Sequence, residues 1–230
     1  MTSGILYIVA TPIGNLEDIT LRALETLKRV DLIVCEDTRT TKKLLKHYEI
    51  ETNTLSFYAR FKGEAAVKPR PRIDEILGHI EEGKNIALVT DAGTPGISDP
   101  GNQLVEAAVA EGICVIPIPG VSAITTLASV SGIDMTRFVF LGFPPHKKGR
   151  ETFFKEVLSI GYPVMYFESP HRIVRNLELL EKLGSEKKII VGRELTKMFE
   201  EIIRGETDQI LDFFAKNDYK IRGEFVIIVY

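Results

Sequence analysis

The stretch Leu88-Val-Thr-Asp-Ala-Gly-Thr-Pro-Gly-Ile-Ser-Asp-Pro-Gly101 decides the fold of this chain. An apolar strand is expected at 85–90, directly before the loop, and an amphipathic helix at 104–111, after it. Between Asp91 and Gly101 there are three glycines, two prolines and two aspartates. Glycines let a ligand approach the backbone, and prolines stiffen a loop. At the carboxyl end of a strand in an α/β sheet such a loop predicts a ligand site, and a tight connection is the alternative.

Short apolar runs and helical patterns alternate on both sides of this loop. Strands are expected at 5–10, 32–35, 54–58, 85–90 and 114–118, and helices at 16–30, 42–48, 73–82 and 104–111, with Asp37 or Thr38 as a cap. This alternation predicts an α/β fold with a mostly parallel sheet. Pro117-Ile-Pro-Gly120 interrupts the pattern. We therefore expect an N-terminal α/β domain at 1–117 and a C-terminal α/β domain at 118–230.

The second half has a different pattern. Helices are expected at 121–131, 151–158, 171–183 and 207–215, and strands at 138–141, 164–167, 188–191, 198–204 and 224–229. Consecutive strands near the end indicate antiparallel pairing, so we expect a mixed sheet. No repeat relates the two halves.

Composition is typical of an ordinary globular protein. The chain has 230 residues, a net charge of -3, 44% hydrophobic and 27% charged residues. A nucleic-acid partner would therefore have to bind a local basic patch. Cys35 and Cys114 lie in apolar runs, so we expect buried, unpaired thiols. With no signal peptide and no apolar run long enough for a membrane span, we expect a cytoplasmic protein.

Common nucleotide fingerprints are absent from the sequence. Neither Gly-x-Gly-x-x-Gly nor Gly-x-x-x-x-Gly-Lys-Ser/Thr occurs, and the loops at 11–15 and 91–101 contain no lysine. Such loops suit a neutral or cationic ligand with a nucleoside part better than a triphosphate. Ser122 opens a helix, where it would act as a cap or contact a ligand carboxylate. The histidines, cysteines and acids show no metal-ligand spacing, so no metal is expected.

Two basic tracts have the character of RNA-binding segments. One contains Arg60, Lys62, Lys68, Arg70 and Arg72 and follows Phe57 and Tyr58, and the other is 146–150. Cations bind phosphates, and aromatic rings stack on bases. The charged segments 193–197 and 222–224 follow or precede strands, and a solvated rim of ion pairs is the alternative there.

Eight motifs in order resemble one family across nearly the whole chain. They are Val9-Ala-Thr-Pro-Ile-Gly-Asn15, Glu36-Asp-Thr-Arg39, the loop 91–101, Pro119-Gly-Val-Ser-Ala123, Gly142-Phe-Pro-Pro, Glu168-Ser-Pro-His-Arg172, Arg193-Glu-Leu-Thr-Lys197 and Arg222-Gly-Glu224. Together they resemble the bacterial small-subunit ribosomal RNA (cytidine-2'-O)-methyltransferases of the tetrapyrrole methylase superfamily. The segment 58–72 departs from the polar segment usual in that family.

The resemblance implies a fold, a reaction and partners. It implies two α/β domains with S-adenosylmethionine in the cleft between them, a homodimer, and methylation of a cytidine ribose 2'-hydroxyl in the decoding region of 16S rRNA, within the 30S subunit. S-adenosylhomocysteine would be the product. Carried onto this chain, the cofactor-binding residues are Pro12, Asp91, Ala92, Gly93, Thr94, Ile97, Ser122, Ala123, Phe167 and Leu195.

Catalytic and RNA-binding residues are hypotheses within that resemblance. A ribose hydroxyl is a poor acid, and the candidates for a base or acceptor are Asp99, Glu168 and His171, among which the sequence does not choose. The candidates for phosphate contacts are Arg39, Lys147, Lys148, Arg150, Arg172, Lys197 and Arg222. Two alternatives stay open: a related methyltransferase acting on a tetrapyrrole or other small acceptor, and a non-catalytic RNA-binding module.

Overall fold

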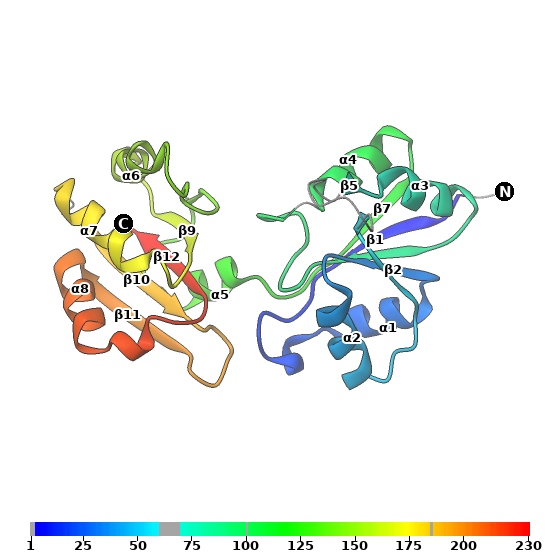
Figure 1. The fold of residues 1–230 in the computed structure, drawn as a ribbon, viewed down its shortest axis with the longest axis horizontal. Coiled ribbons are helices and arrows are strands. Elements are labelled where there is room, and N and C mark those ends of the chain that lie inside the picture. The colour runs from blue at the N-terminus through cyan, green and yellow to red at the C-terminus, as the bar shows by residue number, and fades with distance from the viewer. Residues whose placement is uncertain (1–2, 60–69, 100, 185) are drawn as a thin grey trace, which may run out of the picture. The chain divides into compact units, whose positions relative to one another are not determined.

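The computed structural model describes residues 3–59, 70–99, 101–184 and 186–230. The chain divides into two units, Met1–Ser122 and Ala123–Tyr230, and each has its own sheet with helices on both faces (Figure 1). The sequence places the boundary at 117/118. The division falls after Ser122 because the turn that follows the last strand of the first sheet packs on that sheet, where Gly120 lies against Ala10.

The first unit contains a five-stranded, fully parallel sheet in the order β3-β2-β6-β1-β7. Its strands are β1 (Ile5–Val9), β2 (Leu32–Cys35), β3 (Thr54–Ser56), β6 (Ile86–Val89) and β7 (Cys114–Ile118). The predicted parallel sheet is confirmed. β6 lies in the middle and is buried along its whole length, which explains its uninterrupted apolar sequence.

Two pairs of helices cover the two faces of this sheet (Figure 1). They are α1 (Leu21–Arg29) and α2 (Thr38–His47) on one face and α3 (Ile73–Glu81) and α4 (Asn102–Ala110) on the other. Side chains alternate along β6: Val89 joins the core under α1 and α2, whereas Leu88 joins the core under α3 and α4.

Several predicted boundaries are wrong because of local caps. The helix expected at 16–30 is a 3₁₀ turn, η1 (Leu16–Asp18), followed by α1, because Thr20 is extended and its hydroxyl accepts from Ala23 N–H over 3.1 Å. α2 begins at Thr38 rather than at 42, since the Asp37 carboxylate accepts from Arg39 N–H over 2.8 Å.

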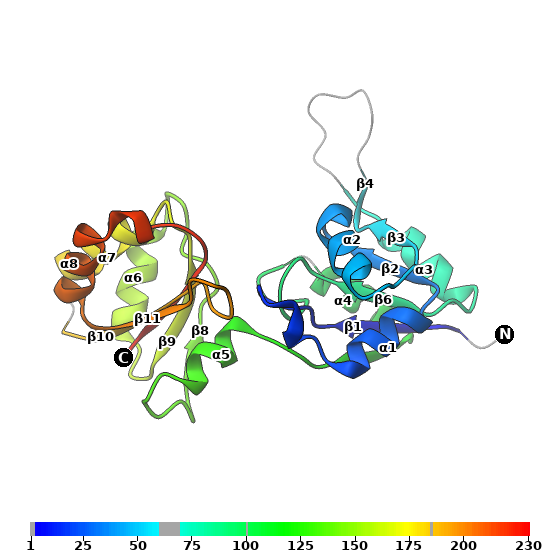
Figure 2. The same cartoon turned by 90° about the horizontal axis from the view of Figure 1, so that it is seen from below.

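The strand expected at 54–58 is divided. β3 is followed by β4 (Tyr58–Ala59), which pairs antiparallel with β5 (Arg70–Pro71) in a separate two-stranded sheet (Figure 2). The basic residues Arg60, Lys62 and Lys68 lie outside the described residues. The RNA contacts expected of this tract therefore stay a prediction.

The second unit contains a mixed sheet in the order β11-β10-β12-β9-β8. Its strands are β8 (Val139–Phe140), β9 (Val164–Glu168), β10 (Lys188–Arg193), β11 (Glu201–Glu206) and β12 (Phe225–Val229). β8 and β9 are parallel, and the other neighbours are antiparallel. The predicted mixed sheet is confirmed.

Helices of the second unit lie on both faces of its sheet (Figure 2). They are α5 (Ala123–Ser129), α6 (Arg150–Ser159), α7 (Ile173–Lys182) and α8 (Thr207–Lys216), with a 3₁₀ turn, η2 (Asp218–Lys220), before β12. Phe154, Leu177 and Phe214 bring α6, α7 and α8 to one core. In the part of the chain that the structure describes, no helix has the length and apolar character needed to cross a membrane.

The two cysteines differ in environment. Cys35 ends β2 and is fully buried, as expected. Cys114 is exposed, so the expectation of a second buried thiol is wrong. The physical reason is position, because Cys114 opens β7, which is an edge strand of the sheet.

Candidate functional site

Three loops of the first unit meet at the carboxyl ends of neighbouring strands. β6, β1 and β7 lie side by side, and they are followed by residues 91–101, 11–15 and 119–122. Thr11 N–H donates to the Gly93 carbonyl over 2.9 Å, and Gly93 N–H donates to the Thr11 carbonyl over 3.0 Å. The Thr94 hydroxyl donates to the Val121 carbonyl over 3.1 Å. Segments far apart in sequence therefore form one surface that is rich in backbone groups.

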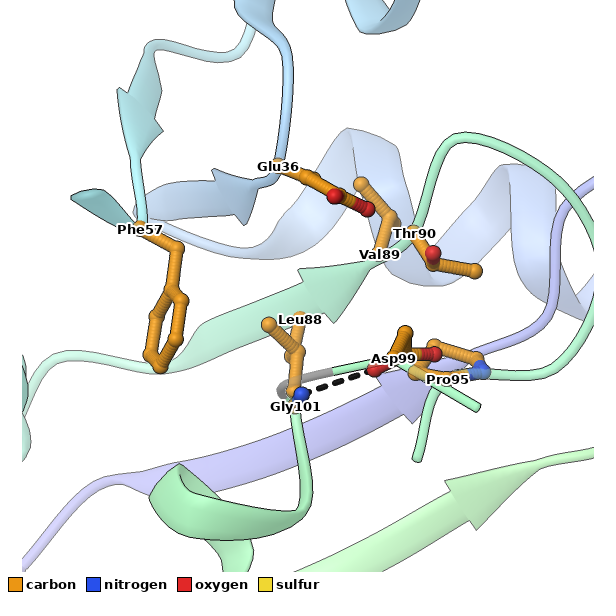
Figure 3. Close-up of a pocket in the computed structure, with 8 residues that line it drawn as sticks. All are labelled: Glu36, Phe57, Leu88, Val89, Thr90, Pro95, Asp99 and Gly101. Atoms are coloured by element: carbon orange, nitrogen blue, oxygen red, sulfur yellow. Dashed lines mark hydrogen bonds between the residues drawn. The ribbon is translucent and has the colours of Figure 1, made fainter. Parts of the chain in front are cut away.

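Asp99 holds the Gly-rich loop in its shape. Its carboxylate accepts from Gly96 N–H over 2.8 Å. It also accepts from Gly101 N–H over 2.7 Å (Figure 3). Gly96 has φ +87° and Ser98 has φ +61°, so the loop bends through the left-handed region twice within three residues. A non-glycine residue adopts that region only when its surroundings hold it there. Asp99 thus has a structural role, whatever chemistry it also performs.

Glu36 is a residue of this surface that opens the motif Glu36-Asp-Thr-Arg39 but was not among the predicted site residues. It follows β2 and lines a small pocket with Thr90 and Asp99 (Figure 3). The pocket has a volume of about 10 Å³, close to what a single water needs. Burial raises the pKa of the Glu36 carboxyl, and the charges of Asp91, Asp99 and Asp37 raise it further. Its place at the end of a strand beside β6 is the signal that could have found it.

Asp91 belongs to the same group of acids. Its carboxylate accepts from Asp37 N–H over 3.3 Å. Burial raises the pKa of Asp91, although this hydrogen bond opposes the rise. The structure therefore brings four carboxylates to the ends of β2 and β6, where none of the loops contributes a lysine.

Seven of the ten predicted cofactor residues lie in these three loops. Ile97 in the Gly-rich loop is 41% exposed, and Pro12 in the loop 11–15 is buried. The full set is Pro12, Asp91, Ala92, Gly93, Thr94, Ile97 and Ser122. Sequence reasoning thus identified residues that the first unit does bring together.

The other predicted cofactor residues lie in the second unit. Phe225 of β12 pairs with Glu168 of β9 on one side and with Arg193 of β10 on the other. The carboxyl ends of β9 and β10 therefore lie at the same edge of the sheet, with Phe167 at the end of β9 and Leu195 just after β10. Ala123 is the first residue of α5.

Glu168 is buried at this edge, with an exposure of 3%. Its carboxylate accepts from the Asn176 amide and from Ser169 N–H at 2.8 Å, and it lies 3.5 Å from Arg172 Nε. Burial raises the pKa of Glu168, and these partners together with Arg172 oppose the rise. His171, two residues before α7, is exposed instead.

Arg172 joins two loops of the second unit. Its guanidinium donates to the Pro144 carbonyl over 2.8 Å and to the Ser169 hydroxyl over 3.0 Å, and the side chain is only 13% exposed. Phe167 contributes an aromatic group beside this junction, with ring centroids 5.0 Å from Phe140 and 5.2 Å from Phe143.

The motifs 193–197 and 222–224 interlock. Lys197 Nζ donates to Glu194 over 2.8 Å and to Glu224 over 2.9 Å, and Glu224 N–H donates to Glu194 over 2.9 Å. Burial alone would lower the pKa of Lys197, but its two ion pairs raise it above the ordinary value. Leu195 lies inside this connection and is 5% exposed. The ion pairs that were the alternative interpretation of these segments are therefore present, and they hold the segment that contains the predicted cofactor residue Leu195.

A family model decides what this arrangement belongs to. The model described as Tetrapyrrole (Corrin/Porphyrin) Methylases matches residues 5–211, which span both units. The chain belongs to the tetrapyrrole methylase family.

Relatives of this methylase are similar to it in sequence along almost the whole chain. A Thermotoga maritima protein is 44% identical over 98% of this chain and 98% of its own length, and a Halalkalibacterium halodurans protein is 43% identical over 98% and 75%. A Leptospira biflexa protein is 42% identical over 98% and 90%. All three carry the name "Ribosomal RNA small subunit methyltransferase I". This methylase is therefore an enzyme that transfers methyl groups.

Solved structures share the fold at low identity. A cobalt precorrin-4 methyltransferase has a TM-score of 0.68 at 18% identity and covers 98% of this chain and 94% of its own. A putative diphthine synthase from Entamoeba histolytica has a TM-score of 0.67 at 18% identity, with 98% and 92% covered. These likenesses confirm the fold of the methylase.

The predicted RNA-binding cations of this methylase differ in exposure and in their contacts. Lys147, Lys148 and Arg222 are exposed, as is Arg39, which pairs with Asp37 over 2.6 Å. Arg172 and Lys197 are engaged in the contacts above, whereas Arg150 opens α6 and is half-buried. Phosphate binding by all seven stays a prediction. Among the described residues, no group of histidine, cysteine and acidic side chains could hold a metal ion.

Proposed function

We propose that this methyltransferase transfers a methyl group from S-adenosylmethionine to the ribose 2'-hydroxyl of a cytidine in the decoding region of 16S rRNA. The observation that carries the proposal is the set of relatives named ribosomal RNA small subunit methyltransferase I, at 43% and 44% identity over 98% of this chain. The oxygen and the nucleotide follow from the eight motifs that resemble the cytidine-2'-O enzymes. Likeness to the precorrin methyltransferase concerns the fold and gives no support to a tetrapyrrole acceptor.

The loops of the first unit suit the proposed donor. S-adenosylmethionine supplies a methyl group bound to a positively charged sulfur. Backbone carbonyls and the carboxylates Asp91, Asp99 and Glu36 favour a cation, and the loops 11–15 and 91–101 contain no lysine that would repel it. The same surface would hold neutral S-adenosylhomocysteine less tightly, which favours product release.

Residues of both units are proposed to hold the donor. The first unit would supply the backbone of Gly93 and Thr94 and the side chain of Ile97, which is 41% exposed. The second would supply Ala123, Phe167 and Leu195. The Glu194–Lys197–Glu224 ion pairs hold Leu195, and the contacts of Arg172 hold the loops beside Phe167. Rigid support of this kind positions the reacting groups, which can supply much of the rate acceleration.

The three candidate bases differ in burial and in the hydrogen bonds that their side chains already make. Asp99 accepts two backbone hydrogen bonds, and Glu168 is buried against Asn176. His171 is exposed and has a ring nitrogen that can accept the hydroxyl proton. We therefore propose His171 as the base, if one is used. We also propose a cytoplasmic homodimer acting on 30S subunits.

One assay tests this function. Incubation with methyl-labelled S-adenosylmethionine and 30S subunits from cells that lack the modification should give about one methyl group per subunit, on a cytidine ribose. Nuclease digestion and mass spectrometry locate the label. If the protein binds S-adenosylmethionine normally but labels neither 30S subunits nor free 16S rRNA, the proposed acceptor is wrong.

A further inference from the structure

A pocket of about 400 Å³ lies in the second unit, and none of the proposed donor residues lines it. It is formed by the loop between β10 and β11 and by the segment from η2 toward β12. Its lining residues are Arg193, Met198, Phe199, Glu200, Glu201, Tyr219, Lys220 and Arg222. This volume lies within the range of small-molecule sites.

The floor of the pocket is a buried arginine. Arg193 is 5% exposed, and its Nε donates to the Lys220 carbonyl over 2.6 Å while Nη1 donates to the Phe199 carbonyl over 3.0 Å. One guanidinium therefore links the loop between β10 and β11 to the segment that contains η2. The pocket is part of the folded framework rather than a gap between loose loops.

Exposed apolar side chains form the rim. Met198 is 91% exposed, Phe199 68% and Tyr219 58%. Large apolar side chains this exposed, and gathered at one pocket, mark a binding surface. Exposed aromatic rings provide a surface on which unpaired bases stack, and Lys220 Nζ lies over one face of the Tyr219 ring, 6.0 Å from its centroid.

The charged side chains that line the pocket indicate which kind of ligand it would bind. Arg222 is exposed at the rim and can face a phosphate. Glu201 pairs with Lys220 over 2.6 Å, and Glu200 accepts from Thr196 N–H over 2.6 Å. Each carboxylate has further acceptor capacity, and carboxylates accept from the exocyclic amine of cytosine. Stacking surface, a cation and acceptors are together the chemistry of a nucleotide site.

We propose that this pocket binds an unpaired, amino-bearing base of the substrate RNA, next to the nucleotide that is methylated. The inference rests on the proposed RNA substrate and deepens it. The base stacks on Tyr219 and Phe199, Arg222 binds its phosphate, and Glu200 or Glu201 accepts from its amino group. Met198 is three residues beyond Leu195 on the same loop. A base held here is therefore anchored to the segment that contributes a proposed donor contact.

Single alanine variants test the stacking contacts. Tyr219→Ala and Phe199→Ala should each weaken binding of a cytidine hexanucleotide and raise the KM for 30S subunits by about 5- to 100-fold, with donor affinity unchanged. Tyr219→Phe should restore binding, because the ring is retained. Tyr162→Ala is the matched control, since Tyr162 is 40% exposed elsewhere in this unit and lies over Arg137.

Base choice provides a second readout. Wild-type protein should bind hexanucleotides of cytidine or adenosine more tightly than those of uridine, which lacks the amino group, and Glu201→Gln with Glu200→Gln should reduce the difference. Arg222→Ala should lower the salt dependence of RNA binding.

Each contrary outcome is distinct. Unchanged RNA affinity in both alanine variants would overturn the base pocket. If the variants instead lose the dimer in sedimentation and keep their RNA affinity, the surface is an interface between two copies and the base pocket is also overturned. If wild-type protein binds the cytidine hexanucleotide through Tyr219 but methylates no RNA, the pocket stands and the proposed function fails.

Discussion

Gly223 carries a backbone angle and a contact that together exclude a side chain. Its φ is +88°, and a Cβ there would lie 2.3 Å from the carboxylate carbon of Glu194. That carboxylate is the centre of the ion pairs with Lys197 and of the hydrogen bond from Glu224 N–H. The Arg222-Gly-Glu224 motif is thus explained by backbone geometry as well as by charge.

Gly223→Ala should therefore lower the free energy of unfolding by about 1–3 kcal/mol, since a left-handed alanine is strained and Glu194 must move. Denaturant unfolding measures it. The matched control is Gly78→Ala in α3, where no atom lies within 4 Å of the added Cβ. Helix propensity should make that variant more stable by about 0.5–1 kcal/mol. Equal stability of the two variants would contradict this explanation.

Glu36 should make stability depend on pH. Its native pKa is raised above the ordinary 4.5 by burial and by neighbouring acids, so its favourable contribution is present below that value and lost as pH rises through the native pKa. Glu36→Gln stays neutral. The stability of this variant relative to wild type should increase as pH rises from about 4 to about 8, by less than about 1 kcal/mol because solvent screens the site.

Unfolding in urea at several pH values checks this, with Glu106→Gln on the exposed side of α4 as the control. If the stability of Glu36→Gln relative to wild type instead falls as pH rises, the native pKa of Glu36 is not raised and the prediction is wrong. The prediction is independent of any ligand, because it concerns acids that are close together in the folded protein.

At the scale of elements, the loop 91–101 depends on one side chain. Asp99 supplies acceptors for Gly96 N–H and Gly101 N–H. Asp99→Ala should weaken S-adenosylmethionine binding by about 10-fold or more, since losing two charge-assisted hydrogen bonds frees the loop. Calorimetric titration measures it, with Asp212→Ala, at an exposed ion pair of α8, as the control.

The same variant separates support from chemistry. If Asp99 instead acts as the catalytic base, kcat falls while donor affinity stays at the wild-type value. A loss confined to affinity assigns Asp99 to the loop, and the role of base remains with the exposed His171.

Element boundaries show where sequence patterns are sufficient. β2 and β7 begin and end at the predicted residues, because both are short apolar runs that end at charged or turn residues. The start of the helix predicted at 16–30 is wrong because apolar spacing continues through Thr20, where the backbone is extended and the side chain caps α1. Helical periodicity reports which face is buried, and it does not report where a cap interrupts the chain.

At the scale of the whole molecule, the division into two units has a consequence for ligand binding. The proposed donor contacts come from residues up to and including Ser122 and from Ala123 onward, which belong to different units. S-adenosylmethionine should therefore slow backbone hydrogen exchange in loop 91–101 and also near Leu195. Exchange should stay unchanged in α8, which contains no proposed contact. Protection limited to the first unit would contradict donor contacts from both units.

The sequence by itself determined that the chain has two α/β units, which loop binds the ligand in our proposal, and that the chain belongs to the tetrapyrrole methylase family. Those properties depend on local patterns: apolar runs, turn residues and motifs in a fixed order. Only the tertiary structure showed that Glu36 joins Asp91 and Asp99, that Cys114 is exposed and that Arg172 and Lys197 are held by internal partners. The physical reason is that burial, pKa and ion pairing depend on strand order and on contacts between residues far apart in the chain, which no local pattern records.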